Sequence, residues 1–139
     1  MEMRTDETIL LVEDDMVDAM TVKRALKDLN ITNTLIIKSN GEEALAYLRD
    51  GTNEKPCIII LDLNMPKMNG VELLRVLKQD EHLRRIPVVI LTTSKGEQDR
   101  FQTFDLGVAG YMIKPVEYPQ FVEVVRNINL YWTLSELSE

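Results

Sequence analysis

The sequence has few of the residues that mark disulfide-stabilised proteins or histidine-based metal and catalytic sites. It contains one cysteine and one histidine in 139 residues. Because one cysteine cannot form an internal disulfide, Cys57 favours a reducing compartment. The residues near His82 would not complete a metal site or a catalytic triad, so we interpret it as a solvated loop residue.

Long apolar segments are also missing. The longest apolar run, from Cys57 to Leu61, is far shorter than the roughly 20 residues that a membrane-spanning helix needs. The segment from Met1 to Thr8 is mostly polar and does not resemble a signal peptide. We therefore expect a cytoplasmic protein that does not enter membranes.

Positive charge is in deficit, with 16 Lys and Arg against 23 Asp and Glu and a net charge of −7. This balance disfavours non-specific binding to nucleic acid or to anionic membranes, which are themselves negative. The composition, 45% hydrophobic and 28% charged, is typical of a globular protein. At about 150 residues per domain, the length predicts a single domain over residues 1–139.

Short apolar runs alternate with segments of helical periodicity. The predicted strands are 9–12, 35–37, 57–61, 88–91 and 111–113. The predicted helices are the segment in which Ala19, Val22, Leu26 and Leu29 recur, then 42–48, 71–77, 97–106 and 118 to about 130, with Gly107 as a left-handed C-cap. This alternation predicts an α/β fold with a doubly wound, five-stranded parallel sheet and five helices.

Polar residues follow the strands where a parallel sheet binds its ligands, at the carboxyl ends. They are Glu13 and Asp14 after the first strand, Asp62 after the third, Thr92 at the fourth and Lys114 at the fifth. Neighbouring carboxylates repel and favour a hard cation such as Mg²⁺, and Lys114 adds a second positive charge. Together these residues predict a site, here called the phosphoryl clamp, in which Mg²⁺ and Lys114 both bind a phosphoryl group.

Within this clamp, Asp62 is the best candidate for a nucleophile that takes the phosphoryl group as an aspartyl phosphate. It follows a central strand, and we expect the tight loop containing Pro66 and Asn69-Gly70 to keep its carboxylate accessible. Simpler roles suit some neighbours: Asp15 as N-cap of the first helix, and Thr93 and Ser94 as caps of the fourth.

Four motifs carry a family resemblance: LVEDD at 11–15, LDLNMP at 61–66 with Asn69-Gly70, LT at 91–92 and GYMIKP at 110–115. Over about residues 8–130 the chain resembles the receiver domain of two-component response regulators, with 131–139 as a C-terminal helix extension. The resemblance implies the flavodoxin-like strand order 2-1-3-4-5.

The resemblance also implies residue roles. Asp62 is the expected phosphoacceptor, and Glu13, Asp14, Asp62 and the Asn64 backbone carbonyl are the expected Mg²⁺ ligands. Glu13 stands where aspartate is more frequent, so it is a candidate to hold the metal through water.

The remaining implied roles concern the phosphoryl group and the response to it. Lys114 would pair with the bound phosphoryl group and Thr92 would hydrogen-bond to it. Thr92 and Tyr111 would form the switch, and the bond from Lys114 to Pro115 would be cis.

The predicted function is that of a phosphorelay response regulator, not an enzyme, phosphorylated by a sensor histidine kinase and signalling through protein contacts. The resemblance extends to regulators paired with phytochrome-type kinases. Alternatives are a degenerate receiver that acts as a scaffold, and a phosphatase of the haloacid dehalogenase type. The phosphatase is disfavoured because Asn64 stands where its second aspartate would be.

The last predicted helix has two apolar stripes. Phe121, Val125, Ile128 and Trp132 form one, which suits packing against the sheet. Leu130, Leu134 and Leu137 form another, which the core would leave uncovered if the helix continues. We therefore expect a homodimer through the C-terminal helix; the alternative is a helix that frays near Leu130.

Overall fold

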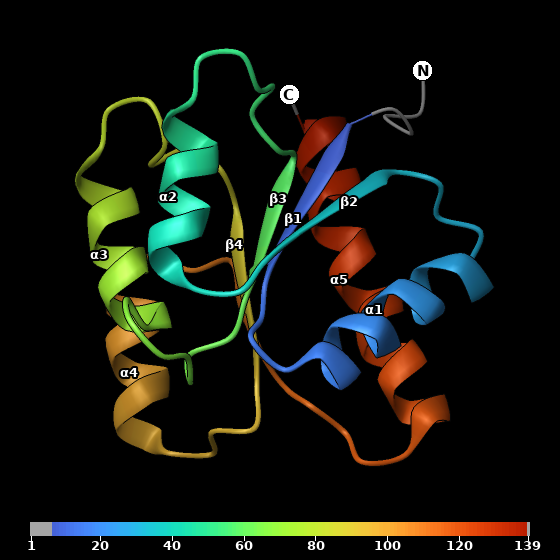
Figure 1. The fold of residues 1–139 in the computed structure, drawn as a ribbon. Helices are drawn as coiled ribbons and strands as arrows, with labels where there is room; N and C mark the ends of the chain where they lie inside the picture. Colours follow the sequence, from blue (N-terminus) through green and yellow to red (C-terminus); the bar gives the residue numbers. More distant parts are fainter. Residues whose placement is uncertain (1–6, 139) are drawn as a thin grey trace.

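A computed structural model describes residues 7–138, and the side chains of residues 7–130 (Figure 1). The strands are β1 (Thr8–Val12), β2 (Thr34–Lys38), β3 (Ile58–Leu61), β4 (Val88–Thr92) and β5 (Gly110–Ile113). The helices are α1 (Met16–Asp28), α2 (Gly41–Arg49), α3 (Gly70–Gln79), α4 (Glu97–Asp105) and α5 (Tyr118–Ser138).

The five strands form one parallel sheet in the order β2-β1-β3-β4-β5, which confirms the predicted topology. In the central pair, Ile9 lies opposite Ile58 and Val12 lies opposite Leu61. Every residue of β3 and β4 is buried. Strands buried on both faces need apolar residues at every position, which is why these runs show no polar alternation.

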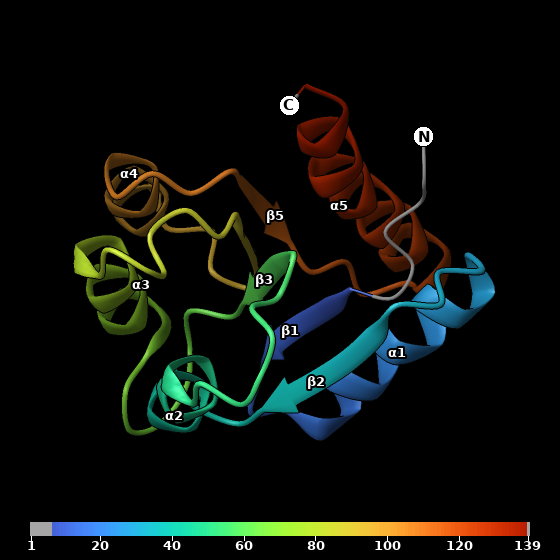
Figure 2. The same ribbon diagram turned by 90° about the horizontal axis from the view of Figure 1, so that it is seen from above.

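Helices cover both faces of the sheet, with α1 and α5 on one side and α2, α3 and α4 on the other (Figures 1 and 2). Successive strand residues point to opposite faces. Ile9 and Leu11 accordingly belong to the core under α1 and α5, and Leu10 and Val12 to the core under the other three helices. Since both faces are filled, the ends of the strands are left to carry polar chemistry.

The C-terminal helix confirms the predicted stripe as far as its side chains are described. Phe121, Val125 and Ile128 are buried in the core beside α1, whereas Trp132 lies outside the described side chains. The backbone stays helical to Ser138, so fraying near Leu130 is not observed. No helix in the described part of the chain is long and apolar enough to cross a bilayer.

Two predicted helix ends are confirmed and one is wrong. The Asp15 carboxylate caps α1 by accepting from the N–H groups of Val17 and Asp18, and Gly107 has a positive φ of 88° after α4. The N-cap of α4, however, is Gly96, not Thr93 or Ser94. The helix begins at Glu97, so Gly96 and not Thr93 or Ser94 occupies the N-cap position.

Candidate functional site

Asp62 stands directly after β3, where its N–H donates to the Val12 carbonyl at 3.0 Å. The following loop turns tightly into α3, and the Gly70 N–H donates to the Leu63 carbonyl at 3.1 Å. A Cβ at residue 70 would collide with the Asp62 carbonyl oxygen and the Leu63 Cα, so only glycine fits there. The predicted tight loop is therefore present.

The Asp62 carboxylate is less accessible than the sequence led us to expect. Asp62 is only 5% exposed. Its carboxylate is packed against Lys114 and beside Glu13, both of which come from other strand ends. Both neighbours are distant from Asp62 in the chain, so the sequence around Asp62 does not reveal its burial.

Three carboxylates gather at this edge of the sheet, the lower edge in Figure 1. Single oxygens of Glu13, Asp14 and Asp62 lie within 4.8 Å of one another, with Asp14 exposed and the other two buried. The Asn64 N–H donates to Asp62 Oδ1 at 3.4 Å, so the Asn64 backbone lies next to the cluster. The sequence-predicted acidic residues are thus brought together.

Lys114 provides the positive charge at the centre of the site. Its Nζ lies 2.5 Å from Glu13 Oε1, 2.8 Å from Asp18 Oδ2 and 3.4 Å from Asp62 Oδ2. The Lys114 side chain is 6% exposed. The peptide bond from Lys114 to Pro115 is trans, as are all those described, so the expectation of a cis bond is wrong. Trans is the lower-energy isomer even before proline.

Burial and neighbouring charges shift the pKa values of Glu13 and Lys114. Burial raises the pKa of Glu13 to about 8, assisted by the Asp62 charge and opposed by the hydrogen bond with Lys114. For Lys114, burial lowers the pKa, but hydrogen bonds to Asp18 and Glu13 and the charges of Glu13 and Asp62 outweigh it. The net pKa of Lys114 lies above its ordinary value, so the ammonium stays charged at neutral pH.

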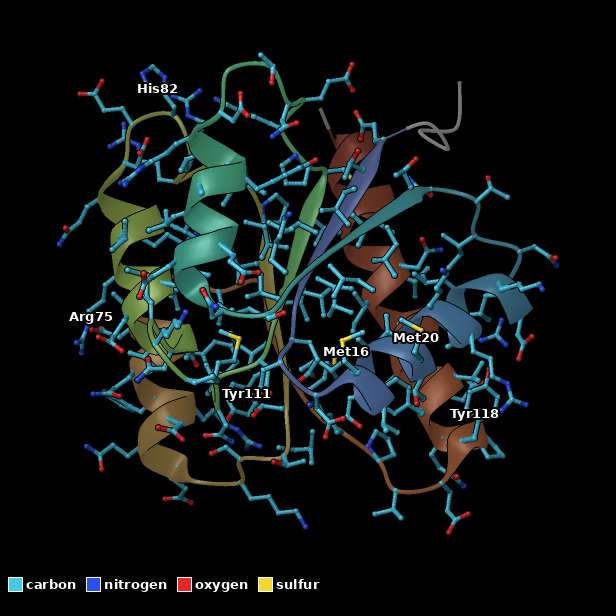
Figure 3. All side chains as sticks on the ribbon, in the orientation of Figure 1. Met16, Met20, Arg75, His82, Tyr111 and Tyr118 are labelled. Atoms are coloured by element: carbon cyan, nitrogen blue, oxygen red, sulfur yellow. The ribbon has the colours of Figure 1, made fainter. Side chains whose placement is uncertain are left out.

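The two predicted switch residues meet through the loop after β4. Thr92 is fully buried, and its Oγ1 accepts from the Ser94 N–H at 3.3 Å. The Tyr111 hydroxyl donates to the Ser94 carbonyl at 2.9 Å. Figure 3 shows Tyr111 beside α4, where its ring lies 6.5 Å from the Phe104 ring. Ser94 therefore links Thr92 to Tyr111.

Sequence reasoning missed two contributors to the site, Asp18 and Ser94. Asp18 is the third residue of α1, and helical side chains lean toward the helix N-terminus, which here begins just beyond β1. That lean was the available signal that its carboxylate reaches over the strand end. Ser94 joins Thr92 and Tyr111 through its backbone N–H and carbonyl, which residue identity does not reveal.

Comparison with known proteins agrees with this geometry. The profile of the response regulator receiver domain matches residues 9–126. The probable methanogenesis regulatory protein FilR2 of Methanothrix harundinacea is 39% identical over 127 residues, which cover 89% of this chain and 82% of that protein. Response regulator Rcp1 of Synechocystis is 38% identical over 135 residues, covering 94% and 92%.

Solved structures extend the likeness to three dimensions. The phosphorylated cyanobacterial phytochrome response regulator RcpA has a TM-score of 0.85 at 38% identity, covering 92% of this chain and 94% of that one. The Mn²⁺-bound form of Rcp1 has a TM-score of 0.84 at 38% identity, covering 91% and 94%. The chain belongs to the response regulator receiver family and is a phosphorelay response regulator. The scaffold and phosphatase alternatives are not favoured.

Proposed function

We propose that Asp62 is the phosphoacceptor and that a sensor histidine kinase is the donor. The observation that carries this proposal is the contact of Lys114 with Asp62, which is one of a cluster of three carboxylates. A nucleophilic carboxylate flanked by a fixed ammonium suits the transfer of an anionic group, because the ammonium offsets the charge that develops on the phosphoryl oxygens. In the transfer, one Asp62 oxygen bonds to phosphorus as the bond from phosphorus to the donor nitrogen breaks.

Glu13, Asp14, Asp62 and the Asn64 carbonyl form the metal site in this proposal. The cluster fits a divalent cation because all of its side-chain donors are hard carboxylate oxygens within 4.8 Å of one another. We propose Mg²⁺ as the physiological ion, since it is bound by few carboxylates and completes its shell with water and phosphate oxygens. Bound there, the ion would supply positive charge in addition to that of Lys114.

Intact-mass measurement with acetyl phosphate tests the phosphoacceptor. The wild type should gain one phosphoryl group only when Mg²⁺ is present, and Asp62→Asn should gain none. A stable adduct of wild-type amount on Asp62→Asn would refute the assignment. Thermal melting with and without Mg²⁺ tests the metal ligands: the ion should raise the melting temperature of the wild type and not that of Asp14→Ala.

The response to phosphorylation in this proposal runs through Thr92 and Tyr111. Thr92 would turn its hydroxyl toward the phosphoryl group on Asp62. That movement would disturb the hydrogen bond from the Ser94 N–H to Thr92 Oγ1. Because Tyr111 is bonded to the Ser94 carbonyl, the same movement would reach the surface formed by α4 and β5.

The partner side of the proposal is a phytochrome-type kinase, in the cytoplasm, with output through protein contacts and not through catalysis on small molecules or binding of nucleic acid. Its support is the similarity to Rcp1 and to phytochrome response regulator RcpA, together with the net charge of −7. We treat residues 1–139 as a single receiver unit with its core at about 8–130. Phosphotransfer from a purified phytochrome kinase, compared with an unrelated kinase, tests the pairing.

We further propose a homodimer through α5. Leu130 is 48% exposed on a helix that continues to Ser138. Light scattering on the full chain, on a chain ending at Trp132 and on Leu130→Glu tests this. A dimer for the full chain and monomers for both variants are expected; three monomers, or a dimer that survives both changes, would contradict the proposal.

A further inference from the structure

Three carboxylates, those of Glu13, Asp18 and Asp62, surround the Lys114 ammonium. The proposed phosphoacceptor, Asp62, is the most distant of the three. A lysine ammonium has three N–H donors. The contacts with Glu13 at 2.5 Å and Asp18 at 2.8 Å are shorter than the contact with Asp62 at 3.4 Å. In this state, two other acids hold Lys114 more closely than the proposed phosphoacceptor does.

Asp18 differs from the other two acids in position and exposure. Glu13 and Asp62 belong to the cluster that could hold a cation, and Asp18 does not. The Asp18 side chain comes from the first turn of α1 and is 30% exposed, whereas those of Glu13 and Asp62 are almost fully buried. A cation held by the cluster would draw on the charges of Glu13 and Asp62 and leave Asp18 paired with Lys114.

We propose that Asp18 is a positioning residue that competes with the incoming phosphoryl group for Lys114. This inference rests on the proposed role of Asp62. The Asp18 carboxylate accepts a hydrogen bond from the Lys114 ammonium at 2.8 Å and so links the first turn of α1 to the residue that follows β5. To bind a phosphoryl group on Asp62, Lys114 must loosen its bond to Asp18, so Asp18 weakens phosphoryl binding and sets how easily the active state forms.

A simpler role for Asp18 is to complement the dipole at the N-terminus of α1, as first-turn acids commonly do. That role concerns the helix alone and would leave the phosphoryl site unaffected. The competing role instead predicts that removal of the Asp18 charge strengthens binding at Asp62. The two roles are therefore separated by one measurement.

The experiment is calorimetric titration of the full chain with beryllofluoride, a phosphoryl mimic, at saturating Mg²⁺. Asp18→Asn is expected to bind beryllofluoride on the order of three- to tenfold more tightly than the wild type. Its Mg²⁺ affinity, measured without beryllofluoride, should change much less, because Asp18 is outside the acidic cluster. The melting temperature of each variant in EDTA confirms that it is folded.

Asp15→Asn is the matched control. It removes the same charge three residues earlier, and asparagine caps helices as well as aspartate does. Because Asp15 caps α1 and the described ion pairs of Lys114 are with Glu13, Asp18 and Asp62, this variant should bind beryllofluoride like the wild type.

The outcomes separate this inference from the proposed function. Equal or weaker binding by Asp18→Asn would overturn the competing role, and so would an equal gain in both variants, which would indicate general electrostatics. Wild-type protein that binds no beryllofluoride, with Asp62→Asn equally silent, would instead refute the phosphoacceptor assignment itself.

Discussion

Helices α3 and α4 cover the same face of the sheet, yet they are held to it in different ways (Figure 2). Leu73, Leu74 and Leu77 of α3 are buried, and Asn69 and Glu72 form a capping box at its start. Among the residues of α4, all of them described, only Thr103 is buried, and the N-cap Gly96 has no side chain to offer. Phe101 is 76% exposed.

The difference indicates which part of the molecule is free to respond. α3 follows the loop of Asp62, and its buried leucines anchor the helix in which that loop ends. α4 follows the loop of Thr92 and is connected to the proposed switch residues Thr92 and Tyr111 through Ser94, whose hydroxyl donates to Asp99 at 2.6 Å. Elements with few buried contacts open at low free-energy cost, which suits the response to phosphorylation that we propose for α4.

Truncating a buried side chain of α3 and an exposed side chain of α4 should give the largest difference in the free energy of unfolding. Leu74→Ala is expected to lower the free energy of unfolding by about 2–5 kcal/mol, because it removes fully buried methyl groups and leaves a cavity. Phe101→Ala should change it by no more than about 0.5 kcal/mol, since most of that ring is already in water. Urea unfolding measures both. Similar losses would show that α4 is packed as firmly as α3.

The pH dependence of the metal-free protein should separate global from local stability. The pKa of Glu13 is raised from 4.5 to about 8 in the folded chain. The folded state thus holds a proton that the unfolded state releases, and the Glu13 contribution to stability, full below about pH 4.5, is lost as pH rises through about 8.

We expect α3 amides, on a helix with several buried leucines, to exchange through global unfolding, so their protection should follow this decline. We expect α4 amides, on a helix with one buried residue, to exchange through local opening, so their protection should follow it much less. Urea unfolding in EDTA across this pH range gives the global value. Glu13→Gln, which has no carboxyl group to titrate, should lose this part of the slope. An unchanged slope in that variant would assign the pH dependence to other groups.

Phosphorylation should alter amide exchange in residues 95–106 and leave residues 70–79 nearly unchanged. The reason is that the path from Thr92 through Ser94 reaches α4, while α3 is held by buried leucines. Exchange with and without beryllofluoride and Mg²⁺, read by mass spectrometry, tests this. Identical exchange of 95–106 in both states would place the response on another face.

Substitutions at the N-caps of the two helices should have smaller effects than the loss of a buried leucine. Asn69→Ala should cost about 1 kcal/mol by removing the capping box. Gly96→Asn should gain a few tenths of a kcal/mol and slow exchange in α4, because residue 96 has extended N-cap geometry and an added Cβ meets nothing closer than 3.7 Å. A loss of stability in Gly96→Asn would show that the loop before α4 needs glycine.

Much of the molecule follows from local sequence. The apolar runs predicted all five strands because strands buried on both faces must be apolar throughout. Glu13, Asp14, Asp62, Thr92 and Lys114 were predicted to meet because the carboxyl ends of parallel strands share one edge. Asp15 as a cap and Gly107 as a left-handed residue follow from interactions within a few residues. These features depend on interactions between residues close in the chain and on the alternation of strands with helices.

Only the tertiary structure decided what depends on residues far apart in the chain. Asp62 is buried because Lys114, 52 residues later, lies against its carboxylate. Asp18 entered the site because Lys114, 96 residues away, comes within 2.8 Å of it. The cap of α4 is Gly96, not Thr93 or Ser94, because the helix begins only at Glu97. Such contacts are set by how strand ends and helix turns meet in space, which residue type and spacing do not specify.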